Sequence, residues 1–142
     1  ILKPSHDIQG PDFPCTFTLH FIIENNKLNC IVSSRSTDVI LGLPYDMGFF
    51  SLVNELLWKD LTEHGIGIEL GYTMIKADLT QIYDKTSHLA ELVKTNASTK
   101  PREAIWMPKI DSAKLLLRDI RTRETQDSII TNWCIENSYE FS

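Results

Sequence analysis

The residues best suited to chemistry fall in two short blocks, Pro14-Cys15-Thr16 and Arg35-Ser36-Thr37-Asp38. A cysteine attacks only as the thiolate, and a thiol is mostly protonated at neutral pH, so a nucleophilic Cys15 requires a nearby cation. Arg35 is the best local candidate, because a guanidinium stays charged. Taken alone, Cys15 is better explained as a small buried residue at the start of a strand. The chemistry therefore depends on what accompanies these two blocks.

The second block continues as Val39-Ile40-Leu41-Gly42-Leu43-Pro44-Tyr45-Asp46. Together the segments resemble the thymidylate synthase and deoxycytidylate hydroxymethylase family. In that family a loop proline precedes the nucleophilic cysteine, and Arg-Ser-x-Asp-x-x-x-Gly follows after a hairpin. Here 20 positions separate Cys15 from Arg35. The resemblance runs from about Ile1 to Tyr83 and is faint beyond it.

The resemblance implies one-carbon transfer to C5 of a pyrimidine nucleoside monophosphate, with 5,10-methylenetetrahydrofolate as the donor. Carbon C5 is a poor nucleophile, and a thiolate that adds at C6 converts the ring to an enolate or enamine that attacks the donor. Cys15 is then the catalytic thiolate, and Asp38 is the carboxylate that orders the site and faces pyrimidine and folate. The alternative for Asp38 is a turn or helix-capping carboxylate.

The resemblance also assigns the substrate-binding residues. Arg35 and Ser36 match the phosphate grip of the family, a bidentate fork beside a hydroxyl donor; their alternatives are a surface charge and a turn residue. Gly42 lets the backbone approach the base, although turn chemistry explains a glycine there nearly as well. Tyr83 stands where the family has a tyrosine that binds the sugar hydroxyl. Gln81 stands where it has a histidine, and an amide still donates a hydrogen bond.

Asp46 departs from the uracil-using synthases, which carry an asparagine that donates to O4 and accepts from N3–H. Cytosine presents an amino donor at C4 and a bare acceptor at N3, which a carboxyl group matches when it is protonated. The hydroxymethylase branch has Asp here and a Thr after the cysteine, like Thr16. We therefore expect a (d)CMP hydroxymethylase-like enzyme. Asp46 as a simple helix cap is the alternative, and Ser34, His20 and Gln81 are further departures from the family pattern.

Two other functions remain open. One is thymidylate synthase activity, the methylation of dUMP, with a tolerated Asp46. The other is a non-catalytic nucleotide-binding or dimer-forming paralogue. The family arginines that reach the phosphate from a partner chain, and its proton-relaying glutamate, lie upstream of the matching segment. We therefore expect the chain to be one domain, residues 1–142, forming the C-terminal part of a longer protein.

Periodicity predicts the elements that position these residues. Phe17, Leu19, Phe21 and Ile23 alternate with polar residues, which is typical of a half-buried strand. Two asparagines at 25 and 26 predict a hairpin turn. A polar break is expected at 35–38. We expect strands at 15–23, 28–34 and 68–83, and two further strands near 104–107 and 128–135. We expect one helix that begins at 46 and two others at 87–95 and 112–117. The expected fold is α+β, a thymidylate synthase-type mixed sheet flanked by helices.

The composition limits the kinds of molecule that the protein is expected to bind. Lys and Arg number 14 against 19 Asp and Glu, a formal net charge of −5, which disfavours nucleic-acid binding. The family resemblance implies a homodimer, in which the partner chain adds positive charge to the phosphate site. The scarcity of cations in residues 1–71, four against nine anions, agrees with that expectation. No metal site is expected from four scattered histidines, and no run is long enough to span a membrane. Cys30 and Cys134 are expected to be buried thiols of a cytoplasmic protein.

Overall fold

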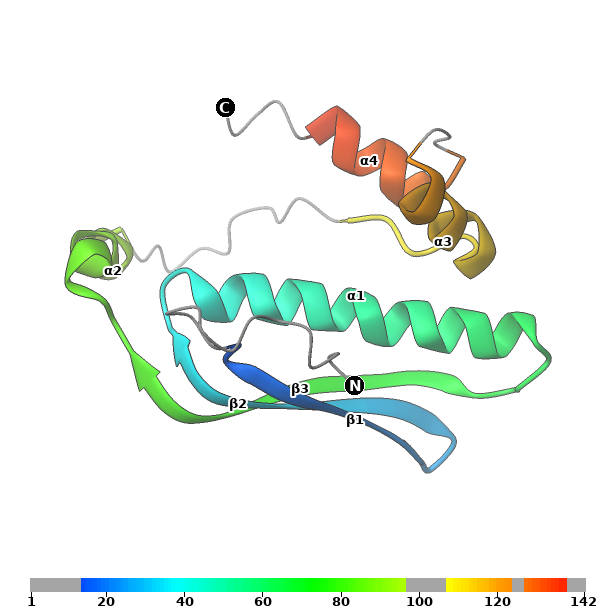
Figure 1. Ribbon diagram of the computed structural model, residues 1–142, viewed down its shortest axis with the longest axis horizontal. Helices are drawn as coiled ribbons and strands as arrows, with labels where there is room; N and C mark the ends of the chain where they lie inside the picture. Colours follow the sequence, from blue (N-terminus) through cyan, green and yellow to red (C-terminus); the bar gives the residue numbers. More distant parts are fainter. Residues whose placement is uncertain (1–13, 97–106, 124–126, 138–142) are drawn as a thin grey trace.

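The computed structural model describes residues 14–96, 107–123 and 127–137 of the chain (Figure 1). No helix among them is long and apolar enough to cross a membrane. The described elements, in chain order, are β1 (Thr16–Glu24), β2 (Lys27–Asp38), α1 (Gly42–Glu63), β3 (Glu69–Gln81), the single-turn 3-10 helix η1 (Asp84–Thr86), α2 (Ser87–Thr95), α3 (Ala113–Thr122) and α4 (Ile129–Asn137).

The three strands form one mixed sheet in the order β1-β2-β3. β1 and β2 are an antiparallel hairpin, and its turn residues Asn25 and Asn26 have positive φ angles of 50° and 61°, as a tight two-residue turn requires. β3 pairs with β2 in parallel, and α1 supplies the crossover connection that parallel strands need. The expected α+β class with a mixed sheet is confirmed.

One face of the sheet packs against α1 (Figure 1). Cys30 and Val32 of β2 are fully buried against Phe50 of α1, and Phe21 and Ile75 from the neighbouring strands pack beside them. Burial raises the pKa of the Cys30 thiol, so this cysteine is an inert core residue. The side chains that alternation assigned to the apolar face of β1 lie on this side.

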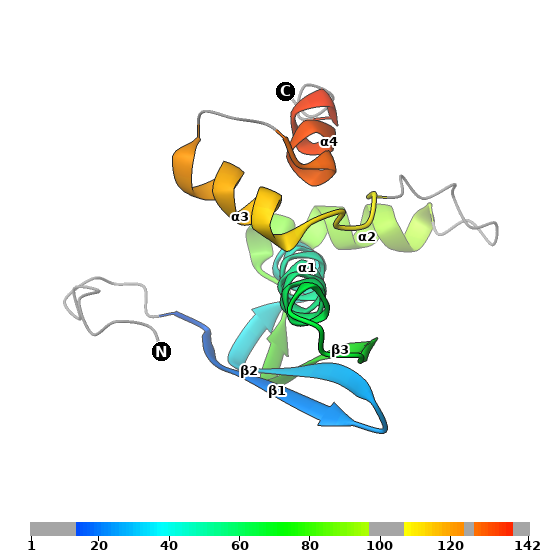
Figure 2. The same ribbon diagram turned by 90° about the vertical axis from the view of Figure 1, so that its right-hand side faces the viewer.

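A second layer of helices covers the other side of α1. Figure 2 shows α1 end-on between the sheet and the pair formed by α3 and α4. Ile110, Leu116 and Ile130 are buried there against Leu52 and Leu56 of α1. Because α1 carries two apolar sides, it joins both cores into a three-layered arrangement.

α4 corrects the prediction of a closing strand at 128–135. Its β-branched residues favour a strand locally. However, the Ser128 hydroxyl accepts a hydrogen bond from the Thr131 N–H at 3.1 Å, which is an N-cap contact. The buried Asp119 carboxylate accepts from the Ser128 N–H at 2.9 Å. These contacts satisfy the N–H groups at the start of a helix, and they outweigh strand propensity. Cys134 of this helix is exposed, so the expectation that it is buried is also wrong.

Other boundaries also differ from the prediction. α1 begins at Gly42, four positions before the expected start, because a proline such as Pro44 fits the first turn of a helix. The expected polar break at 35–38 belongs to β2. The helix expected at 112–117 is α3, which continues to Thr122 from an N-cap at Ser112. Most of the strand expected near 104–107 lies outside the described residues.

Candidate active site

A cavity of about 840 Å³ opens between the start of the β1–β2 hairpin and the N-terminal half of α1. Five of the eight candidate residues line it: Cys15, Ser36, Asp38, Gly42 and Asp46. The rest of its lining is mainly apolar and aromatic, and includes Phe17, Leu19, Phe21, Phe49, Phe50 and Val53. A concave apolar site with a few convergent polar groups is the usual form of a small-molecule site.

Cys15 lies at the mouth of this cavity, directly before β1. Its carbonyl oxygen accepts a hydrogen bond from the Arg35 N–H at 2.9 Å. Its sulfur lies 3.6 Å from the hydroxyl oxygen of Ser36, which is only 8% exposed. The thiol is exposed, in contrast to Cys30. Cys15 is therefore accessible to a ligand and held beside a hydrogen-bonding group.

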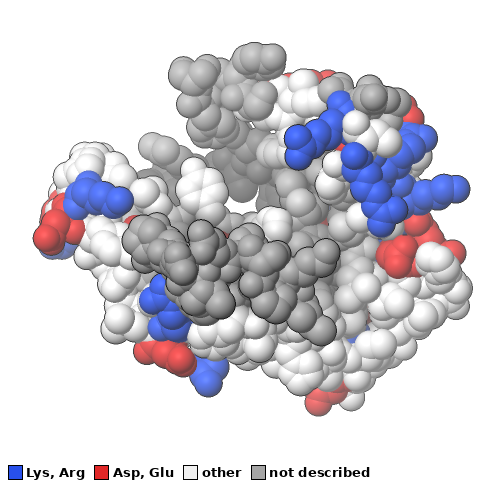
Figure 3. Space-filling view, in the orientation of Figure 1, with Lys and Arg blue, Asp and Glu red and all other residues white. Residues whose placement is uncertain are grey.

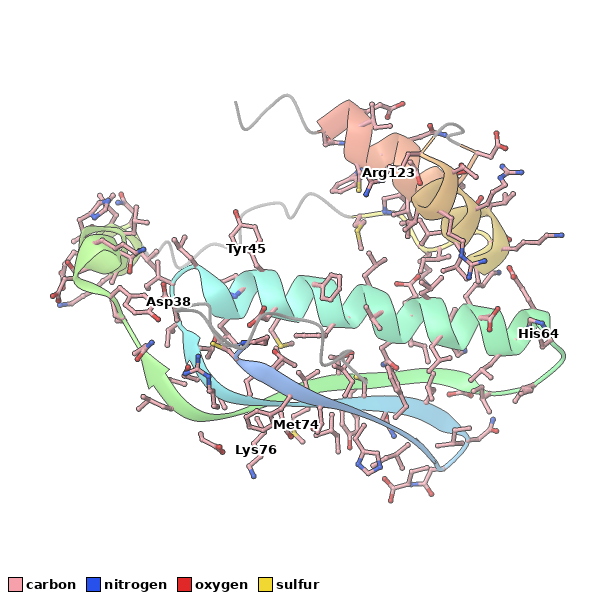
Figure 4. The ribbon with its side chains drawn as sticks, viewed as in Figure 1. Asp38, Tyr45, His64, Met74, Lys76 and Arg123 are labelled. Carbon is pink, nitrogen blue, oxygen red and sulfur yellow. The ribbon has the colours of Figure 1, made fainter. Side chains whose placement is uncertain are left out.

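Asp38 and Gly42 form the end of the cavity where β2 passes into α1 (Figure 4). One carboxylate oxygen of Asp38 accepts a hydrogen bond from the Ile40 N–H at 2.9 Å, so the alternative role of a turn carboxylate is confirmed. A Cβ on Gly42 would lie 3.2 Å from the Thr37 hydroxyl oxygen. The glycine thus packs tightly against the end of β2, and a larger residue would crowd this wall.

Asp46 lies in the second turn of α1, inside the helix. The N-cap position is Leu41, which makes no side-chain capping bond, so the alternative that Asp46 caps the helix is wrong. Burial raises the pKa of the Asp46 carboxyl group. A raised pKa increases the fraction of protonated carboxyl, which can donate as well as accept a hydrogen bond.

Arg35, Gln81 and Tyr83 do not line the cavity. Arg35 is exposed and lies between two buried serines, so strand alternation directs it to the opposite face of the sheet. Gln81 ends β3 beside Asp38, and its backbone carbonyl accepts from the Val39 N–H at 3.0 Å. The Gln81 amide donates to the Tyr83 hydroxyl at 2.7 Å. Gln81 and Tyr83 thus contact each other next to the Asp38 end of the site.

Positive charge gathers away from the cavity. Figure 3 shows Lys and Arg side chains clustered over α3, which packs on the C-terminal half of α1. The exposed cations of this segment are Lys114, Arg118, Arg121 and Arg123. Among the residues that line the cavity there is no Lys or Arg. The described part of the chain also contains no cluster of three or more His, Cys, Asp or Glu that could hold a metal.

Comparison with known proteins identifies the family of the chain. The family profile for thymidylate synthase matches residues 7–141. Thymidylate synthases of Francisella tularensis subsp. holarctica, strains FTNF002-00 / FTA, OSU18 and LVS, are each 36% identical over 44 residues. That alignment covers 31% of this chain and 16% of each relative. The profile covers nearly the whole chain and includes all the candidate residues, and the chain belongs to the thymidylate synthase family.

Proposed function

We propose that the complete protein transfers a one-carbon group to C5 of a pyrimidine nucleoside monophosphate, with Cys15 as the nucleophile. The observation that carries this proposal is the shared cavity of Cys15, Ser36, Asp38 and Asp46. Cys15 lies directly before β1, and the other three residues come from β2 and α1. The pattern of a thiol, a hydroxyl and two carboxyl groups around an apolar cavity suits a planar polar ring. Family membership supports the same chemistry.

The proposed reaction begins when the Cys15 thiolate forms a bond to C6 of the base. Electron density then rises at C5, which becomes able to attack an electrophilic carbon. After that attack the C5 proton is lost to a base, and the bond between the transferred carbon and its donor breaks, which leaves an exocyclic methylene on C5. In the proposed hydroxymethylation water adds to this methylene, the sulfur–C6 bond then breaks, and Cys15 returns as the thiolate. Ser36 lies close enough to hydrogen-bond the sulfur in its charged form. Asp38 sits on the cavity wall at the end of β2, where it orders the turn into α1.

5,10-Methylenetetrahydrofolate supplies the one-carbon unit when bound, and the lining of the cavity fits it. The cavity volume falls in the range of roughly 300–1,000 Å³ that is usual for drug-sized ligands. Phe17 and Phe49 are 52% and 60% exposed, so their rings offer apolar faces to a flat heterocycle. These two residues are our candidates for holding the pterin or aminobenzoyl ring.

For the phosphate we propose Ser36 and Arg35. Ser36 lies in the cavity, whereas Arg35 leaves β2 from the other face. β1 begins at Thr16, so beyond Arg35 this side of β2 has no neighbouring strand among the described residues. A long guanidinium side chain can pass around such an open edge to a phosphate beside Ser36. Tyr83 and Gln81 are proposed to bind the sugar from the adjoining end of β3.

Cytosine is the proposed base. The raised pKa of Asp46 favours a carboxyl group that accepts from the amino group of cytosine and donates to N3. This would make the enzyme a (d)CMP hydroxymethylase-like transferase. The alternative within the same chemistry is a thymidylate synthase that methylates dUMP. A free thiol nucleophile works where thiols remain reduced, so we propose a cytoplasmic location.

A second copy of the chain is proposed to cover the open face of the sheet. Figure 4 shows Met74 and Lys76 of β3 pointing away from α1. Tyr72 and Met74 are 53% and 45% exposed there, and Ile31 of β2 lies beside Met74 in the sheet register. No described helix covers this face. A symmetric dimer would bury these apolar groups and bring further cations toward the site.

Ligand protection of Cys15 tests the proposal. The complete protein is treated with iodoacetamide at pH 7, with and without dCMP or dUMP, and each cysteine is quantified by peptide mass spectrometry. We expect the nucleotide to slow alkylation of Cys15 and leave that of the exposed Cys134 unchanged. Equal rates at Cys15 with and without nucleotide would contradict the proposed site. Protection without any exchange of the C5 hydrogen would instead favour the non-catalytic nucleotide-binding alternative.

A further inference from the structure

β1 contains an irregularity directly after Cys15. Thr16 pairs with Ser34 of β2 and Thr18 pairs with Ser33, so one extra residue, Phe17, is accommodated in β1. Strict alternation would direct Thr16 to the same face as Thr18, away from α1. The bulge instead turns both Thr16 and Phe17 toward the cavity, which both of them line. The alternation predicted from the sequence is therefore wrong for Thr16.

The redirected Thr16 makes a cross-strand contact. Its hydroxyl oxygen lies 3.0 Å from the hydroxyl oxygen of Ser34. Ser34 is only 1% exposed, so its hydroxyl depends on a partner within the protein. Opposed hydroxyl residues on neighbouring strands are a recognised stabilising pair. The bulge thus brings the two hydroxyl groups together in a partly buried hydrogen bond.

This contact lies between two others that involve Cys15. The Cys15 carbonyl accepts from the Arg35 N–H at 2.9 Å, and the Cys15 sulfur lies 3.6 Å from the Ser36 hydroxyl oxygen. Cys15 and Thr16, at the start of β1, are therefore fixed to three consecutive residues of β2. The Thr16–Ser34 contact thus adds a side-chain bond to the backbone bond that holds the start of β1 at Cys15.

We infer that the Thr16–Ser34 hydroxyl pair is a positioning device, which holds the Cys15 thiol against Ser36 at the mouth of the cavity. A role of this pair in catalysis rests on the proposed function of Cys15 as the nucleophile. The pair itself acts through Cys15 and needs no contact with the substrate. Loss of either hydroxyl frees the end of β1, and the thiol then loses its fixed approach to the Ser36 hydroxyl.

The test measures the rate at which iodoacetamide alkylates Cys15 in this chain, followed by peptide mass spectrometry between pH 6 and pH 9. This reaction needs no nucleotide, so its outcome is separate from that of the proposed function. The variants are Thr16→Val, which removes the hydroxyl and keeps the shape, Ser34→Ala, and the two combined. Thr18→Val is the matched control, because it makes the same change two positions away on the opposite face of β1.

We expect Thr16→Val and Ser34→Ala each to slow alkylation of Cys15 at neutral pH about fivefold, the effect of losing one hydrogen bond. The double variant should be no slower than either single variant, because both remove the same bond. Thr16→Ser should restore the parent rate, and Thr18→Val should keep it.

Three results would overturn the inference: a Thr16→Val rate equal to that of Thr18→Val, additive effects in the double variant, or a Thr16→Ser rate as slow as that of Thr16→Val. Circular dichroism of each variant checks its fold. If Ser34→Ala does not fold, the comparison of Thr16→Val with Thr16→Ser and Thr18→Val decides alone.

Discussion

The sulfur of Cys15 lies 3.6 Å from the hydroxyl oxygen of Ser36, although 21 positions separate the two residues in the chain. The hairpin between them produces this contact, because β2 returns antiparallel to β1 and brings Arg35 and Ser36 back beside Cys15. One polar edge of the hairpin therefore carries both the proposed nucleophilic thiol and the hydroxyl that we propose for the phosphate. The cavity beside it has a mainly apolar lining.

The phosphate assignment predicts a loss of binding that depends on the phosphate. In the complete protein, Arg35→Ala should weaken binding of the nucleoside monophosphate about tenfold, since a charge-assisted hydrogen bond is lost. Binding of the corresponding nucleoside should not change. Lys76→Ala is the matched control, because Lys76 is an exposed cation on the same face of the neighbouring strand. Calorimetric titration measures both ligands, and an equal loss for nucleoside and nucleotide would contradict the assignment.

Asp46→Asn should change the choice of base. The amide matches uracil, whereas the carboxyl group matches cytosine, and a mismatched buried polar group costs roughly 1–3 kcal/mol, or about 5- to 150-fold in affinity. The ratio of kcat/KM for dCMP to that for dUMP should therefore fall in the variant. An unchanged ratio would mean that Asp46 does not read the base, and the hydroxymethylase assignment would lose its main support.

Asp46 should also shape the pH dependence of stability. Its pKa is raised by burial, so between its unfolded and folded pKa values the native state binds more protons than the unfolded state. Its contribution to stability is thus greatest below the unfolded pKa and is lost as the pH rises through the folded pKa. The Asp46→Asn variant has no carboxyl group at this position, so it does not lose stability by this route as the pH rises. Urea unfolding should show the variant gaining stability over the parent at pH 7 relative to pH 3, and a constant difference would contradict this account.

The open sheet face should be an interface. Met74→Glu adds a charge to this face and should shift the complete protein from dimer to monomer in sedimentation velocity. Ile120→Glu is the control, because Ile120 is a similarly exposed apolar residue on α3, away from the sheet. A parent protein that is monomeric at high concentration, or a dimer that both variants leave intact, would refute the proposed interface.

The spacing of apolar and turn-forming residues along the chain was sufficient to predict most of the strands and helices. Alternating apolar residues predicted β1, two asparagines predicted its turn, and the helix expected to open at 46 lies within α1. The pattern failed at α4, where the capping of Ser128 and the buried Asp119 are contacts that only the folded chain provides. It also failed at the start of α1, which was expected at 46, whereas Pro44 already belongs to the first turn of the helix.

The candidate site could be predicted where its residues lie in strands and a helix that follow one another directly in the chain. Cys15, Ser36, Asp38, Gly42 and Asp46 meet in one cavity as the hairpin and the following helix require. The bulge at Phe17 could not be read from residue types, since Phe17 itself fits regular alternation. In the sequence Thr16 matches the hydroxymethylase branch and Ser34 departs from the family pattern, but only the structure reveals that they contact each other.

The most direct test of the proposed function is release of tritium from C5 of labelled nucleotide by the complete protein, supplied with 5,10-methylenetetrahydrofolate. Release requires addition of a nucleophile at C6, which makes it a signature of the proposed step. We predict release by the parent protein and by a variant with the exposed Cys134 changed to Ala, and none by Cys15→Ala, which should still bind the nucleotide. Release by Cys15→Ala at the parent rate would contradict the account.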